Sequence, residues 1–129
     1  MTASSFPATH PSEADQPRRR VCVQGLGFVG AANAIAIASA TDGAGRAVFQ
    51  VVGLDLPNEA GRARADAINN GRFPFSTTDE SLVSAAAETR RLGSLSAVTD
   101  PAVLSEAEVI VVDVGLDLDE KGARIITGR

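Results

Sequence analysis

Short apolar runs alternate with longer stretches of helical composition along most of the chain. The run Val21 to Gln24 is rich in β-branched residues and stops at a glycine, as buried parallel strands do. Two further runs, Val48 to Leu56 and Glu108 to Val114, have the same character, and a short strand is expected near Leu95 to Val98. These four runs predict the strands of a mostly parallel sheet.

The segments between the first strands carry helical patterns. Phe28 to Ala40 is rich in alanine and apolar nearly all round, which predicts a helix lying close on the sheet. Thr41 to Ala47 is rich in turn residues and predicts a loop. The next helix is expected from Asn58, as its N-cap, to Asn70, with Gly71 as its stop.

Two helix starts are predicted further along the chain. Thr77 and Glu80 match a capping box that opens a helix of roughly Asp79 to Leu92, and the glycine that follows ends it. Asp100 is placed to cap a short helix that begins at Pro101. Strands that alternate with helices in this way predict an α/β fold with right-handed crossovers.

The segment from Gly25 to Gly30 reads G-x-G-x-x-G, a weak signal when found alone because glycine-rich turns are common. Here a strand precedes it, a helix opens within it, and the second strand ends at Asp55, 25 positions after Gly30. That context predicts a Rossmann-type dinucleotide-binding turn. A purely structural turn is the alternative.

Each position of this turn has a physical role. Gly25 permits the tight turn, Gly27 lets a pyrophosphate approach the backbone, and Gly30 permits close packing of helix on strand. The amides around Phe28 and Val29, at the helix N-terminus, are expected to bind the pyrophosphate charges.

Asp55 closes the second strand where a carboxylate accepts the ribose hydroxyls of an adenosine and repels a 2′-phosphate. This favours NAD over NADP, although Arg62 and Arg64 on the next helix leave NADP open, with Arg62 as the side chain considered to swing toward the acid. FAD-binding domains use the same turn and acid, so flavin also stays open. A solvated acid at a strand end is the non-binding interpretation of Asp55.

Composition excludes several kinds of partner and site. The 129 residues carry a formal net charge of -4, with 4% aromatics and no Trp or Tyr, so nucleic acid is a poor match as a partner. One cysteine and one histidine exclude an internal disulfide and a zinc cluster, and we expect no metal site. Neither a membrane span nor a signal sequence is present in the pattern, so we expect a soluble, cytoplasmic protein without membrane partners.

Three titratable side chains, Cys22, His10 and Asp113, lie outside the glycine turn and the second strand. Cys22 lies inside the first strand and is expected to be a buried apolar residue, not a nucleophile. His10 has no candidate partner and receives no role. Asp113 interrupts the apolar fourth strand, so it is either a site residue or a sign that the strand end is open to solvent.

The expected strand order is 3-2-1-4, the first half of a dinucleotide-binding fold. Residues 1–19 are expected to be a disordered tail, residues 20–119 a partial NAD-binding Rossmann domain, and residues 120–129 a truncated or atypical end.

Several stretches together resemble the N-terminal NAD-binding domain of the UDP-glucose/GDP-mannose dehydrogenase family. They run from about Arg20 to Asp119 and read VCVQGLGFVGAANAIAIA, VVGLDLPN, INNGRFPF, VTDP and AEVIVVDVGLD. The resemblance carries over cofactor binding only, to the matching positions Gly25, Gly27, Phe28, Val29, Gly30 and Asp55.

The resemblance implies an NAD-dependent enzyme that oxidises the C6 hydroxymethyl of a UDP- or GDP-sugar to a carboxylate in two hydride transfers. It also implies that the cysteine nucleophile and the sugar site lie in a further domain, so we assign no catalytic residue and expect this chain alone to be inactive. Full-length members are typically homo-oligomers. The alternative is a non-catalytic nucleotide-binding module or remnant. One departure is Leu116, where the family has a threonine near the cofactor, which puts the nicotinamide-side geometry in doubt.

Overall fold

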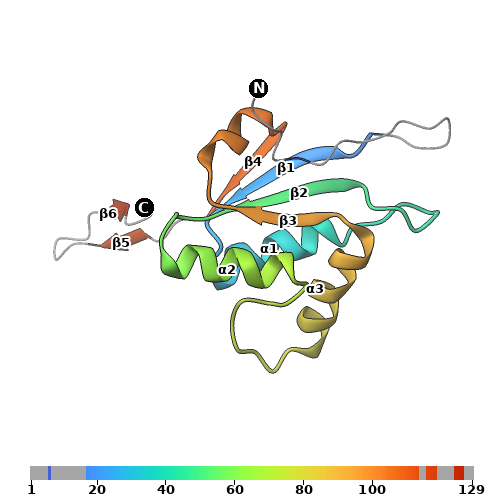
Figure 1. Ribbon diagram of the computed structural model, residues 1–129, viewed down its shortest axis with the longest axis horizontal. Coiled ribbons are helices and arrows are strands. Elements are labelled where there is room, and N and C mark those ends of the chain that lie inside the picture. The colour runs from blue at the N-terminus through green and yellow to red at the C-terminus, as the bar shows by residue number, and fades with distance from the viewer. Residues whose placement is uncertain (1–5, 7–16, 114–115, 119–123, 127–129) are drawn as a thin grey trace.

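A computed structural model of the chain describes residues 6, 17–113, 116–118 and 124–126. Four parallel strands form one sheet in the order β3-β2-β1-β4 (Figure 1). Their bounds are β1 Arg19–Gln24, β2 Phe49–Leu54, β3 Leu95–Val98 and β4 Val109–Val112. The predicted Rossmann-type α/β fold and its strand order are therefore confirmed, although β2 and β4 are shorter than the apolar runs that predicted them.

Three helices lie together on one face of this sheet (Figure 1). They are α1 Phe28–Ala38, α2 Glu59–Asn69 and α3 Glu80–Leu92. The short 3-10 helix η1, Pro101–Glu106, lies on the other face. Two short strands that the sequence pattern did not predict, β5 Leu116–Leu118 and β6 Arg124–Ile126, pair antiparallel with each other.

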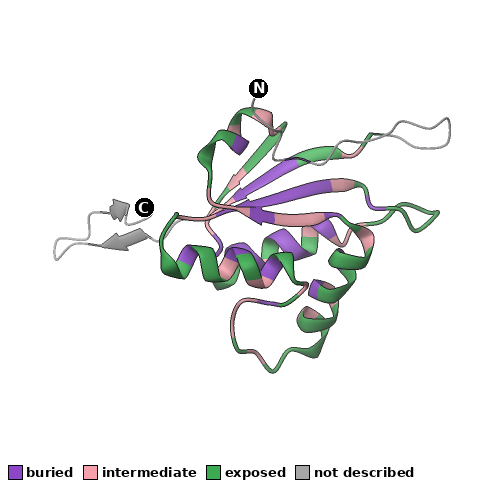
Figure 2. Ribbon diagram, viewed as in Figure 1, coloured by how far each residue is buried: buried purple, intermediate pink, exposed green. Residues whose placement is uncertain are grey.

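The core is divided by the sheet because successive strand residues point to opposite faces. On the helical face, Val21 and Val23 of β1 pack with Ala34 and Ala38 of α1. On the other face, Cys22 clusters with Val103 of η1 and is fully buried, which confirms its expected role as a small apolar residue. Figure 2 shows this burial concentrated in β1 and β2.

Strand β4 is less well covered than its neighbours. Val109, Ile110 and Val112 retain exposed fractions of 43%, 46% and 57%. These residues lie on alternating faces, and β4 pairs with β1 on one edge and with no other strand among the described residues. Strand β4 is therefore partly exposed along its length at the edge of the described sheet, which bears on Asp113 below.

The helix starts differ from prediction at one place. Asn58 caps α2 by accepting from the amide of Gly61, and Asp100 caps η1, both as expected. The cap of α3, however, is Asp79, which accepts from the amides of residues 81 and 82. The hydroxyl of Thr77 instead accepts from the amide of Asp79, so the predicted capping box does not form. Asp79 is two residues closer to the helix than Thr77, so its carboxylate takes the place of the threonine hydroxyl as the cap.

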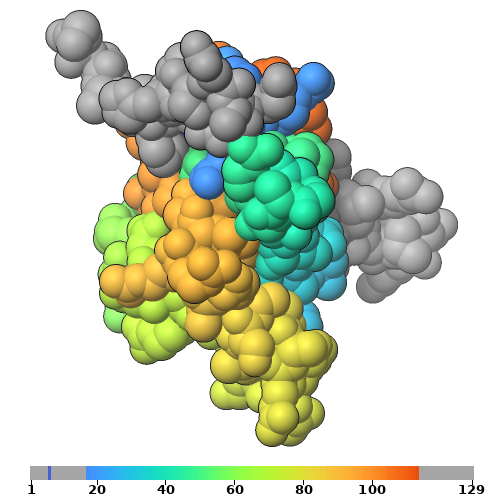
Figure 3. All heavy atoms as spheres, turned by 90° about the vertical axis from the view of Figure 1, so that its right-hand side faces the viewer, coloured from blue at the N-terminus to red at the C-terminus, as the bar shows by residue number. Residues whose placement is uncertain are grey.

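Parts of the predicted domain plan lie outside the described residues, including most of the 1–19 tail and of the 120–129 end. Within the predicted tail, Phe6 is described and is buried beside Cys22 and Val52, and residues 17–19 are described as well, with Arg19 beginning β1. The loop 41–47 and α3 reach the surface at the end of the molecule away from the carboxyl ends of the strands (Figure 3). No helix within the described ranges is long and apolar enough to cross a membrane.

Candidate functional site

The glycine turn joins β1 to α1 at the carboxyl end of the sheet, and its first glycine is sterically required. Gly25 has a φ of +98°, a left-handed conformation that disfavours side chains. A Cβ there would also lie 2.0 Å from the backbone carbonyl oxygen of Asp113. Strand β4 therefore closes directly over the turn.

The second and third glycines differ from each other. A Cβ on Gly30 would lie 1.9 Å from the carbonyl oxygen of Gly25, so its absence lets α1 start directly beneath the turn. A Cβ on Gly27 would meet nothing within 4 Å, and its backbone is extended, with φ -62° and ψ -177°. Gly25 and Gly30 thus serve the fold, whereas Gly27 borders open space.

That open space lies at the N-terminus of α1. Gly27 is the N-cap, and no side chain caps the helix within the described part of the chain. The first amides of a helix have no intrahelical partner, so those of Phe28, Val29 and Gly30 are available to an anion, and the helix dipole favours negative charge there. Backbone groups, not side chains, make this end of the site.

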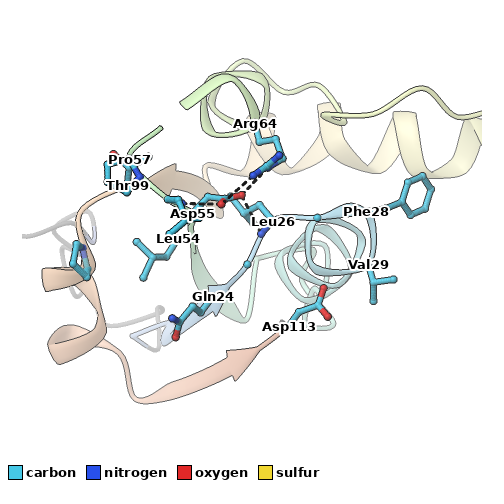
Figure 4. A pocket seen from close by; sticks show the side chains of 14 residues that line it. Gln24, Leu26, Phe28, Val29, Leu54, Asp55, Pro57, Arg64, Thr99 and Asp113 are labelled. Carbon is cyan, nitrogen blue, oxygen red and sulfur yellow. Dashed lines mark hydrogen bonds and ion pairs between the residues drawn. The ribbon is translucent and has the colours of Figure 1, made fainter. Parts of the chain in front are cut away.

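The side chains of Phe28 and Val29 take no part in this polar end. The ring of Phe28 packs edge-on against Phe73, with centroids 4.9 Å apart, and contacts Phe75 at 5.8 Å. Val29 is 59% exposed and points away from Asp55 (Figure 4). This leaves the backbone amides of both residues as their groups at this end, and the predicted role of those amides in binding stays a prediction.

A cleft of about 560 Å³ lies in front of the turn, a size typical of small-molecule sites. It extends from the end of β2 across β1 to the end of β4 (Figure 4). Five of the six predicted cofactor-binding residues line it together: Gly25, Gly27, Phe28, Val29 and Asp55. Gly30 does not line the cleft, because it lies beneath the turn.

Asp55 anchors one end of the cleft. Its Oδ2 accepts from the amide of Leu26 at 3.3 Å and its Oδ1 from the amide of Leu56 at 2.7 Å. Arg64 donates to both oxygens, through Nε to Oδ2 at 2.7 Å and through Nη2 to Oδ1 at 3.2 Å. A carboxylate offers about four acceptor positions, so these four bonds fill Asp55.

This setting fixes the charge of the pair. Burial raises the pKa of Asp55, but the hydrogen bonds and charge of Arg64 and the two backbone amides outweigh it, so the net pKa lies below its usual range. The hydrogen bond to Asp55 raises the pKa of Arg64. Asp55 is thus ionised and paired, not the solvated strand-end acid that was its alternative interpretation.

Of the two arginines that the sequence brought near this acid, Arg64 pairs with it and Arg62, the one considered to swing toward it, does not. Arg62 donates instead to the backbone carbonyl of Pro57, away from the carboxylate. Arg64 reaches Asp55 because α2 lies very close to the end of β2: a Cβ on Gly61 would be 1.9 Å from the carbonyl oxygen of Leu56. Gly61 and Arg64 are three residues apart and so share a helix face, which is the signal that distinguishes the two arginines.

Asp113 lies at the opposite end of the cleft. It follows β4, its amide donates to the carbonyl of Gln24 at 2.8 Å, and its side chain is half-buried. Gln24 pairs in register with both Leu54 and Val112, so Asp55, Gly25 and Asp113 form one row across the sheet. Asp113 borders the cleft beside the exposed strand β4, and its interpretation as a site residue stays a prediction.

Two solved structures share the fold that carries this cleft. The chain superposes on an NDP-N-acetyl-D-galactosaminuronic acid dehydrogenase from Methanosarcina mazei Go1 with a TM-score of 0.68 and 18% identity, over 80% of this chain. It superposes on a GDP-mannose dehydrogenase from Pseudomonas aeruginosa with a TM-score of 0.63 and 26% identity, over 82% of this chain. Both of these structural neighbours are nucleotide-sugar dehydrogenases.

The chain spans about a fifth of the length of these two proteins, 21% and 22% respectively. No protein-family model and no curated protein sequence matches it. The family resemblance drawn from the residues is therefore confirmed through structure, as a dehydrogenase-related fold.

Proposed function

We propose that this chain is the NAD-binding portion of a nucleotide-sugar 6-dehydrogenase. The main observation behind this proposal is that three features line one cleft. They are the N-terminus of α1, which no side chain of the described residues caps, the open space in front of Gly27, and the buried, ionised carboxylate of Asp55. These are the three elements that a dinucleotide needs: donors for its pyrophosphate, room for close approach, and an acceptor for a ribose diol. The dehydrogenase structures that share the fold support the same assignment.

The residues divide the cofactor between them. The amides of Phe28 and Val29 hold the pyrophosphate, because they are the free donors at the positive end of α1 that border the cleft. Asp55 accepts hydrogen bonds from the hydroxyls of the adenosine ribose. Because all four acceptor positions of its carboxylate are filled, at least one hydrogen bond from Arg64 has to break first. Binding of the ribose therefore includes a rearrangement of the Asp55–Arg64 pair.

When bound, the nicotinamide supplies the hydride acceptor for oxidation of an alcohol. The proposed reaction converts the C6 hydroxymethyl of a UDP- or GDP-sugar to a carboxylate, with two hydrides passing to two NAD in turn and water supplying the second oxygen. A thiol nucleophile for that reaction is not offered by this chain, because its one cysteine, Cys22, is fully buried in β1. The chain alone binds the cofactor without turnover.

The test is isothermal titration of the 129-residue chain with NAD, NADP and FAD. We expect NAD to bind most tightly of the three. Asp55→Asn is expected to lower the affinity for NAD about ten-fold or more, because it removes charge-assisted hydrogen bonds to the ribose. Asp66→Asn is the matched control, since it removes one exposed carboxylate from α2 outside the cleft. Unchanged NAD affinity in a folded Asp55→Asn variant contradicts the role of Asp55.

The same titration decides between cofactors. Tightest binding of FAD reassigns the chain to a flavin protein, and tightest binding of NADP shows that Arg64 serves a 2′-phosphate. Absence of binding by all three overturns the proposal. A parallel assay of NADH formation with UDP-glucose or GDP-mannose is expected to show none; steady turnover would contradict the division of binding and chemistry between domains.

A further inference from the structure

The cleft holds two carboxylates with unequal surroundings. Asp55 is neutralised by Arg64, whereas the carboxylate of Asp113 forms no hydrogen bond or ion pair with any described residue. Neighbouring strands lie about 4.8 Å apart, so the ends of β2 and β4, which flank β1, are separated by about 10 Å. Among the described residues, Asp55 at one end of the cleft is therefore paired with a cation, whereas the carboxylate of Asp113 at the other end has no cationic partner.

The side chain of Asp113 is held beside the first turn of α1. Its Oδ2 would lie 2.9 Å from a Cβ on Gly30, and Figure 4 shows its carboxylate next to the helix that carries Val29. The backbone of Asp113 is fixed by its bond to Gln24 and by its carbonyl over Gly25. The carboxylate is thus carried on rigid elements and borders the cleft.

Its position relative to a dinucleotide follows from the topology. The strand order reverses between β1 and β4, and dinucleotides bind across the crevice at that point. If the adenosine ribose lies at Asp55 and the pyrophosphate at the start of α1, the nicotinamide half lies toward β4. Asp113 belongs to that half of the cleft.

Resting on the proposed function, we infer that Asp113 is a specificity-determining residue that favours the oxidised over the reduced cofactor. The nicotinamide ring is a cation when oxidised and neutral when reduced, and the two forms share the same diphosphate and riboses. Repulsion between Asp113 and the diphosphate is common to both forms and cancels in the ratio of their affinities. Attraction to the ring acts on the oxidised form alone, so the reduced product is released more readily.

The test compares the dissociation constants of NAD+, NADH and ADP for the whole chain and for Asp113→Asn. We expect the ratio of the NADH constant to the NAD+ constant to fall about five-fold in the variant, the effect of one charge at partial exposure. Asp66→Asn, an exposed carboxylate outside the cleft, is expected to leave the ratio unchanged. A thermal melt establishes that each variant is folded.

A second measurement needs no variant. Salt screens a partly exposed charge, so the ratio for the unmodified chain should move toward that of Asp113→Asn as ionic strength rises. If Asp113→Asn folds and still binds NAD+ but its ratio is unchanged, the inference is overturned and the proposed function stands. If that variant does not fold, a ratio that does not change with ionic strength in the unmodified chain has the same meaning. Failure of ADP, NAD+ and NADH all to bind overturns the proposed function and the inference with it.

Discussion

Arg64 holds both carboxylate oxygens of Asp55, with Nε 2.7 Å from Oδ2 and Nη2 3.2 Å from Oδ1. The planar guanidinium matches a carboxylate in this two-bond arrangement, and the Asp55 side chain is only 7% exposed. The acid that would select against a 2′-phosphate is therefore accompanied by a cation that would favour one. Under the proposed function, the choice between NAD and NADP therefore depends on the Asp55–Arg64 pair and not on Asp55 alone.

Replacement of Arg64 is expected to sharpen the preference for NAD. In Arg64→Ala the charge of Asp55 is no longer balanced, so it repels a 2′-phosphate more strongly and its oxygens are free for the ribose diol. We expect the ratio of NADP to NAD dissociation constants, measured by titration, to rise about ten-fold, or about 1.4 kcal/mol.

Arg62→Ala is the matched control for that experiment, because Arg62 lies on the same helix but donates to the carbonyl of Pro57. Its ratio is expected to match that of the unmodified chain. A fall in the ratio for Arg64→Ala, or an equal rise in both variants, would show that Arg64 does not balance Asp55 at the ribose site.

Acid is expected to weaken the fold through Asp55. Its folded-state pKa lies below the ordinary value of 3.8, so its contribution to stability is complete above about pH 4 and is lost as the pH falls through the folded pKa. Urea unfolding between about pH 7 and pH 3 should show a smaller loss of unfolding free energy in Asp55→Asn than in the unmodified chain. Other acids titrate in both proteins, so the difference between their unfolding free energies reports Asp55 alone. If the two unfolding free energies fall in parallel as the pH is lowered, Asp55 does not have a lowered pKa in the folded chain.

Cys22 is expected to be unreactive in the folded chain. Burial raises the pKa of its thiol to about 11, and the residue is fully buried in β1. At about pH 8, alkylation by iodoacetamide, followed by mass spectrometry, should accelerate about 100-fold or more when urea unfolds the protein. Similar rates with and without urea would mean that β1 opens readily.

Sequence reasoning succeeded where local pattern and chain topology act together. The alternation of runs and helices, with the turn that begins at Gly25, predicted the strand order and brought Asp55 to the glycine turn. Both follow from constraints that hold for any parallel sheet with one such turn. Asn58 and Asp100 were predicted as caps because an N-cap depends on its immediate neighbours.

The errors arose where distance along the chain misleads. Arg64 is nine residues from Asp55, yet the missing Cβ of Gly61 brings its helix against Leu56 and the two side chains together. Thr77 matched a capping box, but Asp79 lies nearer to the helix and takes the amides. The ambiguity of Asp113 could not be settled from its own run, because the exposure of β4 depends on what lies beside that strand.

The glycines of the turn allow binding to be separated from folding. Gly30→Ala places a Cβ 1.9 Å from a backbone oxygen and is expected to lower the free energy of unfolding by about 3 kcal/mol or more, read from urea melts. Gly27→Ala meets nothing within 4 Å and keeps an ordinary backbone conformation, so its stability should be close to that of the unmodified chain. Equal stability losses in the two variants would contradict the division of roles between these glycines.

The most direct test of the account is the NAD affinity of Gly27→Ala, measured by titration on a protein whose melt shows it to be folded. The added methyl group occupies the space through which a pyrophosphate would approach the first amides of α1. We predict a loss of NAD affinity of about ten-fold or more with stability unchanged. NAD binding as tight as in the unmodified chain would show that the dinucleotide does not bind at this turn.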